Sequence, residues 1–278
     1  MAMVYYLILI LFVGDSGHLV SNMLKNYFSS FFSKESNFLC ETARSSSLIT
    51  VKDSSKWDEN HIYKKLIENN YELIYKAFAD AQEQLSSNKF SESKFFGSTG
   101  TLVFIVKSRM ISANIGDSRG ILTTKQGSQI VFTEDHVTYH PRERERIYLS
   151  GGNIVSQRVI YKSTNFPNLL TTRGFGDLIS KSIGIITTPY INEIEITEEH
   201  KGFIIACGAF YESIYSQDIT STFSKYSYNC LTLVSSLIDQ AVVQAKQANK
   251  PDCEISLMAV LFNNEYHKNL DTSNSMSN

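Results

Sequence analysis

The hydrophobic pattern of the chain begins with an almost unbroken apolar run. Residues 1–13 are mostly Tyr, Leu, Ile, Val and Phe, and the run ends before Gly14. A run of this composition predicts a strand that is buried on both faces. It is too short to cross a bilayer as a helix. A signal-peptide core or partial membrane anchor stays open as an alternative, although no Lys or Arg precedes the run and no small-residue cleavage site clearly follows it.

Helical periodicity follows twice in the next part of the chain. Residues 19–31 repeat apolar side chains every three or four positions, which predicts a helix over 20–32 packed on the sheet of the first strand. Residues 57–85 contain the clearest helical stripe, formed by Ile62, Leu66, Tyr71, Ile74, Phe78 and Ala81. A further long amphipathic helix is predicted over residues 228–247.

Between these helices the period shortens to that of strands. Residues 99–133 predict an antiparallel meander that turns at 107–108, 116–117 and 126–127. A short helix over 140–152 follows, with Pro141 in its first turn and Gly151 at its end. More strands are expected near 153–159, 169–172, 190–196 and 202–207, and the last over 254–262. The order predicts an α+β fold: a central antiparallel β-sandwich with helices on both outer faces.

Length, charge and cysteine usage narrow the class of protein. The 278 residues, 42% apolar, show no composition shift, so we expect one domain over residues 1–263 and a polar, disordered tail over 264–278. The net charge of -2 gives no basic footprint for nucleic acid. The four cysteines have no paired spacing, which favours buried free thiols in a reducing, cytoplasmic compartment.

Local motifs give little chemistry when each is taken alone. The stretch "GSTGT" from Gly97 lacks the Lys of a nucleotide-binding loop and is interpreted as the start of a strand. The stretch "GFGD" from Gly174 predicts a turn. Asp135 and His136 form either half of a site or, in the simpler interpretation, a satisfied polar turn. Asp117 lies at the tip of the turn in "SANIGDSRGIL", where an Asp suits a turn and also suits a metal ligand.

Taken in order, several stretches resemble one family. They are "FFGSTGTLVFIV", "ANIGDSRGIL", "FTEDH", "ERERIYLSGGNI", "LLTTRGFGD", "GIITTPYI" and "FIIACGAFYE", followed by the final "EISLMAVLF". This series resembles the metal-dependent protein serine/threonine phosphatases of the type 2C class. The resemblance implies a β-sandwich between helical layers and two Mg²⁺ or Mn²⁺ ions that activate a bridging water. Two dications about 4 Å apart repel by roughly 16 kcal/mol at an effective dielectric of 20, so several carboxylates must converge on them.

Most of the metal ligands implied by the resemblance are absent. Val13 stands where the family has its bridging Asp, and Asp15 where it has a proton-donor His. Gly208 replaces a ligand Asp, and Cys253 replaces the last one, with Asp252 one residue earlier. A one-residue slip within a strand would turn Asp252 to the opposite face.

Asp117 is the one ligand position that is kept, and in the family it belongs to a weaker, additional metal position. The family's preceding strand, with an acidic pair and a phosphate-binding Arg, has no equivalent before the first apolar run, so we expect a domain that lacks it. With its metal partners replaced, Asp117 is expected to close the turn by side-chain hydrogen bonding.

The sequence therefore supports three readings. The first is a pseudophosphatase that binds a protein partner, either a kinase or a phosphoprotein, and needs no cofactor; the family includes such an inactive, kinase-binding member. The second is an active Mg²⁺- or Mn²⁺-dependent phosphatase with a site rebuilt from Asp15, Asp117, Asp252 and Glu212 or Glu254. The third is a membrane-tethered interaction domain, which is disfavoured because residues 1–13 match a buried strand; we expect no membrane contact.

Overall fold

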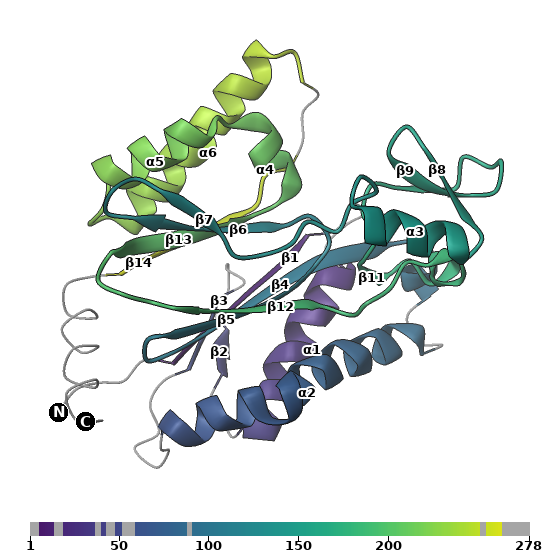
Figure 1. The fold of residues 1–278 in the computed structure, drawn as a ribbon, viewed down its shortest axis with the longest axis horizontal. Coiled ribbons are helices and arrows are strands. Elements are labelled where there is room, and N and C mark those ends of the chain that lie inside the picture. The colour runs from purple at the N-terminus through teal and green to yellow at the C-terminus, as the bar shows by residue number, and fades with distance from the viewer. Residues whose placement is uncertain are drawn as a thin grey trace.

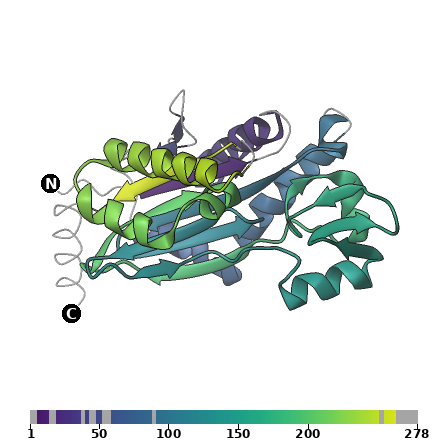
Figure 2. The ribbon, with the colours of Figure 1, turned by 90° about the horizontal axis from the view of Figure 1, so that it is seen from above.

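The structure is a computed structural model that describes residues 6–13, 19–36, 40–42, 48–51, 59–87, 91–250 and 254–262. Two β-sheets lie face to face, with helices covering the outer face of each (Figure 1). A smaller group of strands with its own helix projects at one end of the sandwich, as Figure 2 shows from above. The predicted α+β sandwich flanked by helices is confirmed.

The first sheet has the strand order β12-β5-β4-β1-β3-β2, with β11 pairing with β4. Its strands are β1 (Tyr6–Val13), β2 (Cys40–Thr42), β3 (Leu48–Val51), β4 (Gly97–Val106), β5 (Arg109–Ile115), β11 (Phe175–Gly176) and β12 (Tyr190–Glu195). β1 pairs with β3 on one side and β4 on the other. Leu11 faces the core between the sheets and Phe12 faces the helices, and both are buried. The predicted strand is confirmed over Tyr6–Val13, and Leu11 and Phe12, whose burial is described, are buried on its two opposite faces.

The second sheet has the order β14-β13-β6-β7. Its strands are β6 (Arg119–Thr124), β7 (Gln129–Val131), β13 (His200–Ala206) and β14 (Leu257–Leu261). Apolar side chains of both sheets fill the space between them, including Val103, Leu122, Phe203 and Ile205. These alternate with residues that face the outer helices, which is the pattern expected of sandwich strands.

Two helices cover the first sheet, α1 (Leu19–Ser36) and α2 (Glu59–Ser86). Phe28 lies at the centre of their contact, with its ring 5.4 Å from those of Phe12 and Phe78. The prediction of one unbroken helix over 57–85 is wrong in detail. Residues 69–71 have positive φ angles of 47°, 58° and 65°, so α2 consists of two helical segments joined at a kink.

Three helices cover the second sheet: α4 (Gly208–Ser213), α5 (Ser216–Lys225) and α6 (Cys230–Gln247). Buried residues Phe210, Phe223, Leu233 and Leu237 pack against Ile121 and Ile204 of the sheet. The sequence pattern predicted α6 and missed α4 and α5. No helix in the described part of the chain combines the length and apolar character needed to cross a membrane.

The projecting group consists of α3 (Pro141–Leu149), β8 (Gly152–Val155), β9 (Arg158–Tyr161) and β10 (Pro167–Leu169). Ile147, Val159, Ile183 and Ile185 form its own small core, separate from the main one. Two short 3-10 turns, η1 (Ser91–Lys94) and η2 (Leu178–Ile183), complete the described elements. We call α3, β8, β9 and β10 the lateral subdomain.

The predicted continuous meander over 99–133 is also wrong in one respect. β4 pairs with β5, and β6 pairs with β7, but β5 and β6 belong to different sheets. The turn after Ile115 therefore carries the chain across the sandwich from one sheet to the other. Alternating polarity predicts a strand without specifying its sheet, so this crossing could not be distinguished from a hairpin.

Candidate functional site

The crossing turn between β5 and β6 presents Asp117 at one end of the sandwich. Gly116 has φ +93°, and a Cβ there would lie 2.3 Å from Cγ2 of Thr99, so only glycine fits. The hydroxyls of Thr99 and Ser118 are 2.9 Å apart and join the turn to β4. The backbone thus fixes where the carboxylate of Asp117 emerges.

Gly208 lies directly beside that carboxylate. It is the first residue of α4, and only the N-cap residue Cys207 separates it from the end of β13 at Ala206. A Cβ at Gly208 would be 2.5 Å from Oδ2 of Asp117. The carboxylate therefore occupies the space that a side chain at position 208 would need, and the expected convergence of Asp117 and Gly208 is confirmed.

Val13 ends β1 at the same edge. Its carbonyl oxygen accepts hydrogen bonds from Oγ of Ser98 at 3.0 Å and Oγ1 of Thr99 at 3.4 Å. Thr99 in turn contacts the crossing turn, so Val13, Asp117 and Gly208 share one end of the sandwich. The side chain of Val13 packs on apolar core residues.

The remaining predicted site residues, Asp15, Asp252 and Cys253, lie outside the described residues. The chain just after them does reach this end of the sandwich. The N–H of Cys207 donates to the carbonyl of Ser256 at 3.0 Å, and the N–H of Ser256 donates to Sγ of Cys207 at 3.3 Å.

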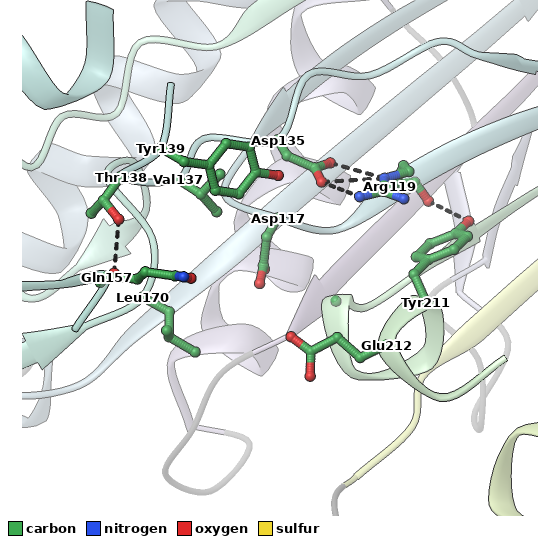
Figure 3. A pocket seen from close by; sticks show the side chains of 11 residues that line it. Asp117, Arg119, Asp135, Val137, Thr138, Tyr139, Gln157, Leu170, Tyr211 and Glu212 are labelled. Atoms are coloured by element: carbon green, nitrogen blue, oxygen red, sulfur yellow. Dashed lines mark hydrogen bonds and ion pairs between the residues drawn. The ribbon is translucent and has the colours of Figure 1, made fainter. Parts of the chain in front are cut away.

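A cleft opens at this end, with a volume of about 220 Å³. Figure 3 shows its lining, which is Asp117, Arg119, Asp135, Val137, Thr138, Tyr139, Gln157, Leu170, Gly208, Tyr211 and Glu212. The carboxylates of Asp117 and Glu212 both point into the cleft in this view. They come from different elements, the crossing turn and α4.

The guanidinium of Arg119 is held by Asp135 and Tyr211. Nε of Arg119 is 3.2 Å from both carboxylate oxygens of Asp135, and Nη2 donates to the same group. This bonding raises the pKa of Arg119 further above its ordinary value. The ring of Tyr211 lies 5.0 Å from the guanidinium, and its hydroxyl donates to the carbonyl of Arg119 at 2.9 Å. Burial raises the pKa of Tyr211, which therefore stays a neutral phenol. The positive charge of Arg119 is thus already neutralised by Asp135.

His136 follows Asp135 and is fully buried beneath the crossing turn. Its ring Nδ1 accepts from the backbone N–H of Gly116 at 3.2 Å, and the backbone N–H of His136 donates to the carbonyl of Gly116 at 2.9 Å. Burial, aided by the charge of Arg173, lowers the pKa of His136 to about 3. Its Nε2 has no hydrogen-bond partner among the described residues. The Asp135-His136 pair therefore has a structural role, in which Asp135 is paired with Arg119 and His136 is neutral.

A second charged cluster, which the sequence pattern did not reveal, surrounds the buried Glu143 of α3. Burial alone would raise the pKa of Glu143, but hydrogen bonds from Arg146, Arg173 and Thr172 hold it far below its usual range. Arg146 reaches the carboxylate at 2.6 Å and 2.8 Å, and Thr172 at 2.6 Å. The available signal was Glu143 three residues before Arg146 in "ERERI", which local charge pairing explains equally well.

The described residues do not fit the two-metal centre that the family resemblance implies. Within the described ranges, no group of three or more His, Cys, Asp or Glu side chains could hold a metal ion. Asp117 and Glu212 supply two carboxylates to the cleft, while Asp135 is bound to Arg119. Mg²⁺ and Mn²⁺ favour about six oxygen ligands each, so this donor set is too small.

The fold and the cleft at its strand ends define a type 2C phosphatase architecture. The chain belongs to this family: the family model "Protein phosphatase 2C" matches residues 14–249. It is 28% identical over 219 residues to "Probable protein phosphatase 2C 72" of Arabidopsis thaliana, which covers 75% of this chain and 61% of that protein. It is 34% identical over 110 residues to "Protein phosphatase 2C homolog 1" of Saccharomyces cerevisiae, covering 40% and 36%. The chain therefore spans less than two thirds of the length of these relatives.

Solved structures agree on the fold. A serine-threonine phosphatase 2C from Toxoplasma gondii superposes with a TM-score of 0.72 at 16% identity, covering 93% of this chain and 85% of that chain. A C. elegans sex determining protein gives 0.64 at 17% identity, covering 95% and 59%. At such low identity the likeness establishes the architecture alone.

Proposed function

We propose that this chain is a type 2C phosphatase-like domain without phosphatase activity, which acts by binding another protein. The observation that carries the proposal is the pair of residues around Asp117. Val13 and Gly208 occupy the positions where the family resemblance implies metal-ligand aspartates, and neither has a carboxylate. A dication held by a single carboxylate keeps most of its water and exchanges freely, so no hydroxide is fixed in line with a phosphate.

The cysteines of the chain also support a cytoplasmic location, which we propose for this protein. Cys207 and Cys230 are free thiols within the described part of the chain, and free thiols suit a reducing compartment. We therefore place the protein in the cytoplasm, where kinases and phosphoproteins are available as partners.

One observation favours a second function. Glu212 points into the same cleft as Asp117, so a rebuilt site could use this carboxylate in place of a missing ligand. A rebuilt phosphatase site predicts saturable Mn²⁺ binding in a calorimetric titration of the purified chain. It also predicts that Asp117→Asn and Glu212→Gln each abolish that binding.

The decisive experiment is a phosphatase assay on the purified chain. We expect no Mg²⁺- or Mn²⁺-dependent hydrolysis of a phosphoserine peptide or of 4-nitrophenyl phosphate. Val13→Asp and Gly208→Asp should each fail to create activity, because each variant leaves the other ligand position empty. An active type 2C phosphatase assayed in parallel provides the positive control. Metal-dependent turnover that disappears in Asp117→Asn would overturn the proposal and favour the rebuilt site.

A further inference from the structure

The second sheet ends at β14, whose outer edge has no neighbouring strand within the described residues. A free strand edge presents a row of backbone donors and acceptors to which another extended chain can pair. Folded proteins commonly protect such an edge with a lysine, a proline or a bulge. The sequence of β14, Leu-Met-Ala-Val-Leu, contains no charge and no proline, and its register with β13 is regular. The outer edge of β14 is therefore open to pairing.

The register of β13 and β14 shows which backbone groups point outward. In an antiparallel pair, residues alternate between bonding their partner and facing away from it. The N–H of Phe262, just after β14, donates to the carbonyl of Lys201 at 2.8 Å, so every second residue before it also bonds β13. The residues that turn their N–H and C=O groups outward are Leu257, Ala259 and Leu261. Among the described residues, only the thiol of Cys230 reaches these groups, at 3.3 Å from the carbonyl oxygen of Ala259.

The side chains of β14 are apolar on both faces and only partly buried. Met258 and Val260 pack toward the core between the sheets, and the other three residues pack toward the helices. All five are partly exposed, although β13 beside them is completely buried from Phe203 to Ala206. A strand on the outer side of β14 would bury both of its faces, as β14 does for β13.

Helix α6 lies above β14 on the outer face of the sheet and adds a second apolar surface (Figure 1). Hydrogen bonds from Gln129 of β7 place α5 over the opposite edge of the sheet. The flank of α6 that faces α5 carries Gln240 and Gln244, which bond α5. The flank that faces away from α5, and so beyond β14, is apolar. Its residues are Leu231, Val234, Ile238 and Val242. Leu231 is 83% exposed and Val242 is 36% exposed.

We propose that the outer edge of β14, beneath the apolar flank of α6, binds an extended apolar segment of a protein partner as an added strand. This inference rests on the proposed function, because it names the kind of segment that the inactive phosphatase domain binds. The outward backbone groups of β14 supply the hydrogen bonds, and the side chains of the segment enter the helical layer and the core between the sheets. Because both of its faces are buried, the segment needs about five consecutive uncharged residues, which span about 17 Å.

Two other occupants fit this edge less well. The sequence after Phe262 is polar, and its apolar residues Tyr266, Leu270 and Met276 are far apart, so it supplies no apolar run. A second copy pairing through its own β14 would bring the two α6 helices to about the spacing of neighbouring strands, about 4.8 Å. Packed helices need about 8–10 Å, so a partner without a helix above its strand fits better.

Amide exchange in the ¹⁵N-labelled chain tests the pairing residue by residue. The probe is the peptide acetyl-Lys-Lys-Val-Ile-Val-Ile-Val-Lys-Lys-amide. At saturation it should slow exchange of the outward amides of Leu257, Ala259 and Leu261 at least tenfold, because each gains a hydrogen bond. The amides of Met258 and Val260 already bond β13 and should change little. A peptide with its five central nitrogens methylated keeps the side chains but loses the donors, and should protect none of these amides.

Ala259→Pro and Val131→Pro form a matched pair of variants. The N–H of Ala259 points outward from β14, and that of Val131 points outward from β7, because the next residue, Phe132, donates to the carbonyl of Gly120. Proline is tolerated where an edge N–H faces away from the sheet. Fluorescence anisotropy of the labelled peptide should show binding weakened at least tenfold in Ala259→Pro and unchanged in Val131→Pro.

Should Ala259→Pro not fold, a substitution in α6 takes its place. Leu231 is mostly exposed and follows Cys230, which contacts the open edge, so Leu231→Asn should weaken the peptide several-fold without harming the fold. Val243 is 51% exposed and lies on another side of α6, so Val243→Asn should bind the peptide like the unmodified chain.

The outcomes separate this inference from the function on which it rests. Outward amides that stay unprotected, protection by the methylated peptide, or equal binding to Ala259→Pro and Val131→Pro would each overturn the inference. Sedimentation equilibrium should show a monomer; a dimer that Ala259→Pro dissociates would assign the edge to a second copy and overturn it as well. Metal-dependent phosphatase turnover would instead overturn the proposed function, whatever the peptides do.

Discussion

The buried side chain of His136 makes the stability of this protein depend on pH. His136 is fully buried, and its pKa is lowered to about 3, so it stays neutral in the folded chain. In the unfolded chain it titrates near its ordinary value of about 6.5. As the pH falls below that value the unfolded state takes up a proton that the folded state refuses, and stability is lost.

We therefore expect His136→Asn to flatten the pH dependence of stability. The side-chain oxygen of Asn can accept from the N–H of Gly116, as Nδ1 of His136 does now. Between pH 7 and pH 5 the unmodified chain should lose about 2 kcal/mol more unfolding free energy than the variant. Urea unfolding at both pH values measures the difference. An equal change in unfolding free energy between pH 7 and pH 5 for the two proteins would refute this assignment to His136.

The place of a single residue in the site could be predicted where a motif in the surrounding sequence indicated it. Val13, Asp117 and Gly208 were placed together by the order of motifs, and the structure brings Asp117 and Gly208 into contact. The pairing of Arg119 with Asp135 was not predicted, because nothing in either stretch indicates a partner sixteen residues away. The metal role of Asp117 itself stays a prediction.

At the scale of elements, the kink in α2 is the feature with the clearest energetic cost. Three consecutive residues without glycine, Asn69, Asn70 and Tyr71, have left-handed backbone angles. Such a conformation costs about 1–2 kcal/mol for most L-residues, and Asn tolerates it best. The hydroxyls of Tyr63 and Tyr71 both donate to Glu193 of β12, at 2.6 Å and 2.9 Å, and hold the kink against the sheet.

Substitution of the exposed Asn70 should separate backbone strain from packing. Asn70→Ala should lower the unfolding free energy by about 1 kcal/mol, because Ala is strained at a φ of 58°. Asn70→Gly should match or exceed the stability of the unmodified chain, since glycine adopts this conformation freely. Thermal unfolding of the pair tests this; an Ala variant as stable as the Gly variant would mean that the kink is not populated in solution.

The elements themselves were predictable where they are long and periodic, and less so elsewhere. β1, α1, α6 and β14 follow directly from hydrophobic spacing. The five-residue step from Leu66 to Tyr71, beside the Asn-Asn pair, was the available sign of the kink. The helices α4 and α5 are short, and their apolar residues pack on a sheet built from distant segments, so their stability comes from contacts that no local window contains.

For the whole molecule, we expect the sandwich and the lateral subdomain to differ in stability, because their hydrophobic cores differ in size. The lateral subdomain has a small core of its own, while the sandwich is filled by much larger clusters. The Glu143 cluster compensates by joining α3 to Thr172 and Arg173, just before β11 enters the first sheet. A buried carboxylate with two arginine partners is costly to disturb, because its removal leaves buried cations unpaired.

Glu143→Gln should therefore loosen the lateral subdomain selectively. We expect its opening free energy to fall by about 3 kcal/mol, which speeds amide exchange in α3, β8 and β9 roughly 150-fold. Strands β5 and β13 should exchange as before. Hydrogen exchange with mass spectrometry measures both regions, and Glu145→Gln, an exposed residue of the same helix, is the matched control. A uniform rise in exchange across the molecule would show that the subdomain does not open independently.

The contact between Gly208 and Asp117 also constrains the mutational paths open to this chain. Aspartate at position 208 would meet the carboxylate of Asp117 at once, since even a Cβ there would lie 2.5 Å from it. Two carboxylates so close repel each other unless a cation is already bound, and Val13 adds no ligand to bind one. On the proposed reading, each single step back toward a metal centre is neutral or harmful, and selection favours none of them alone. Gly208 then makes the loss of catalysis hard to reverse: one substitution is enough to lose it, whereas regaining it requires several substitutions at the same time.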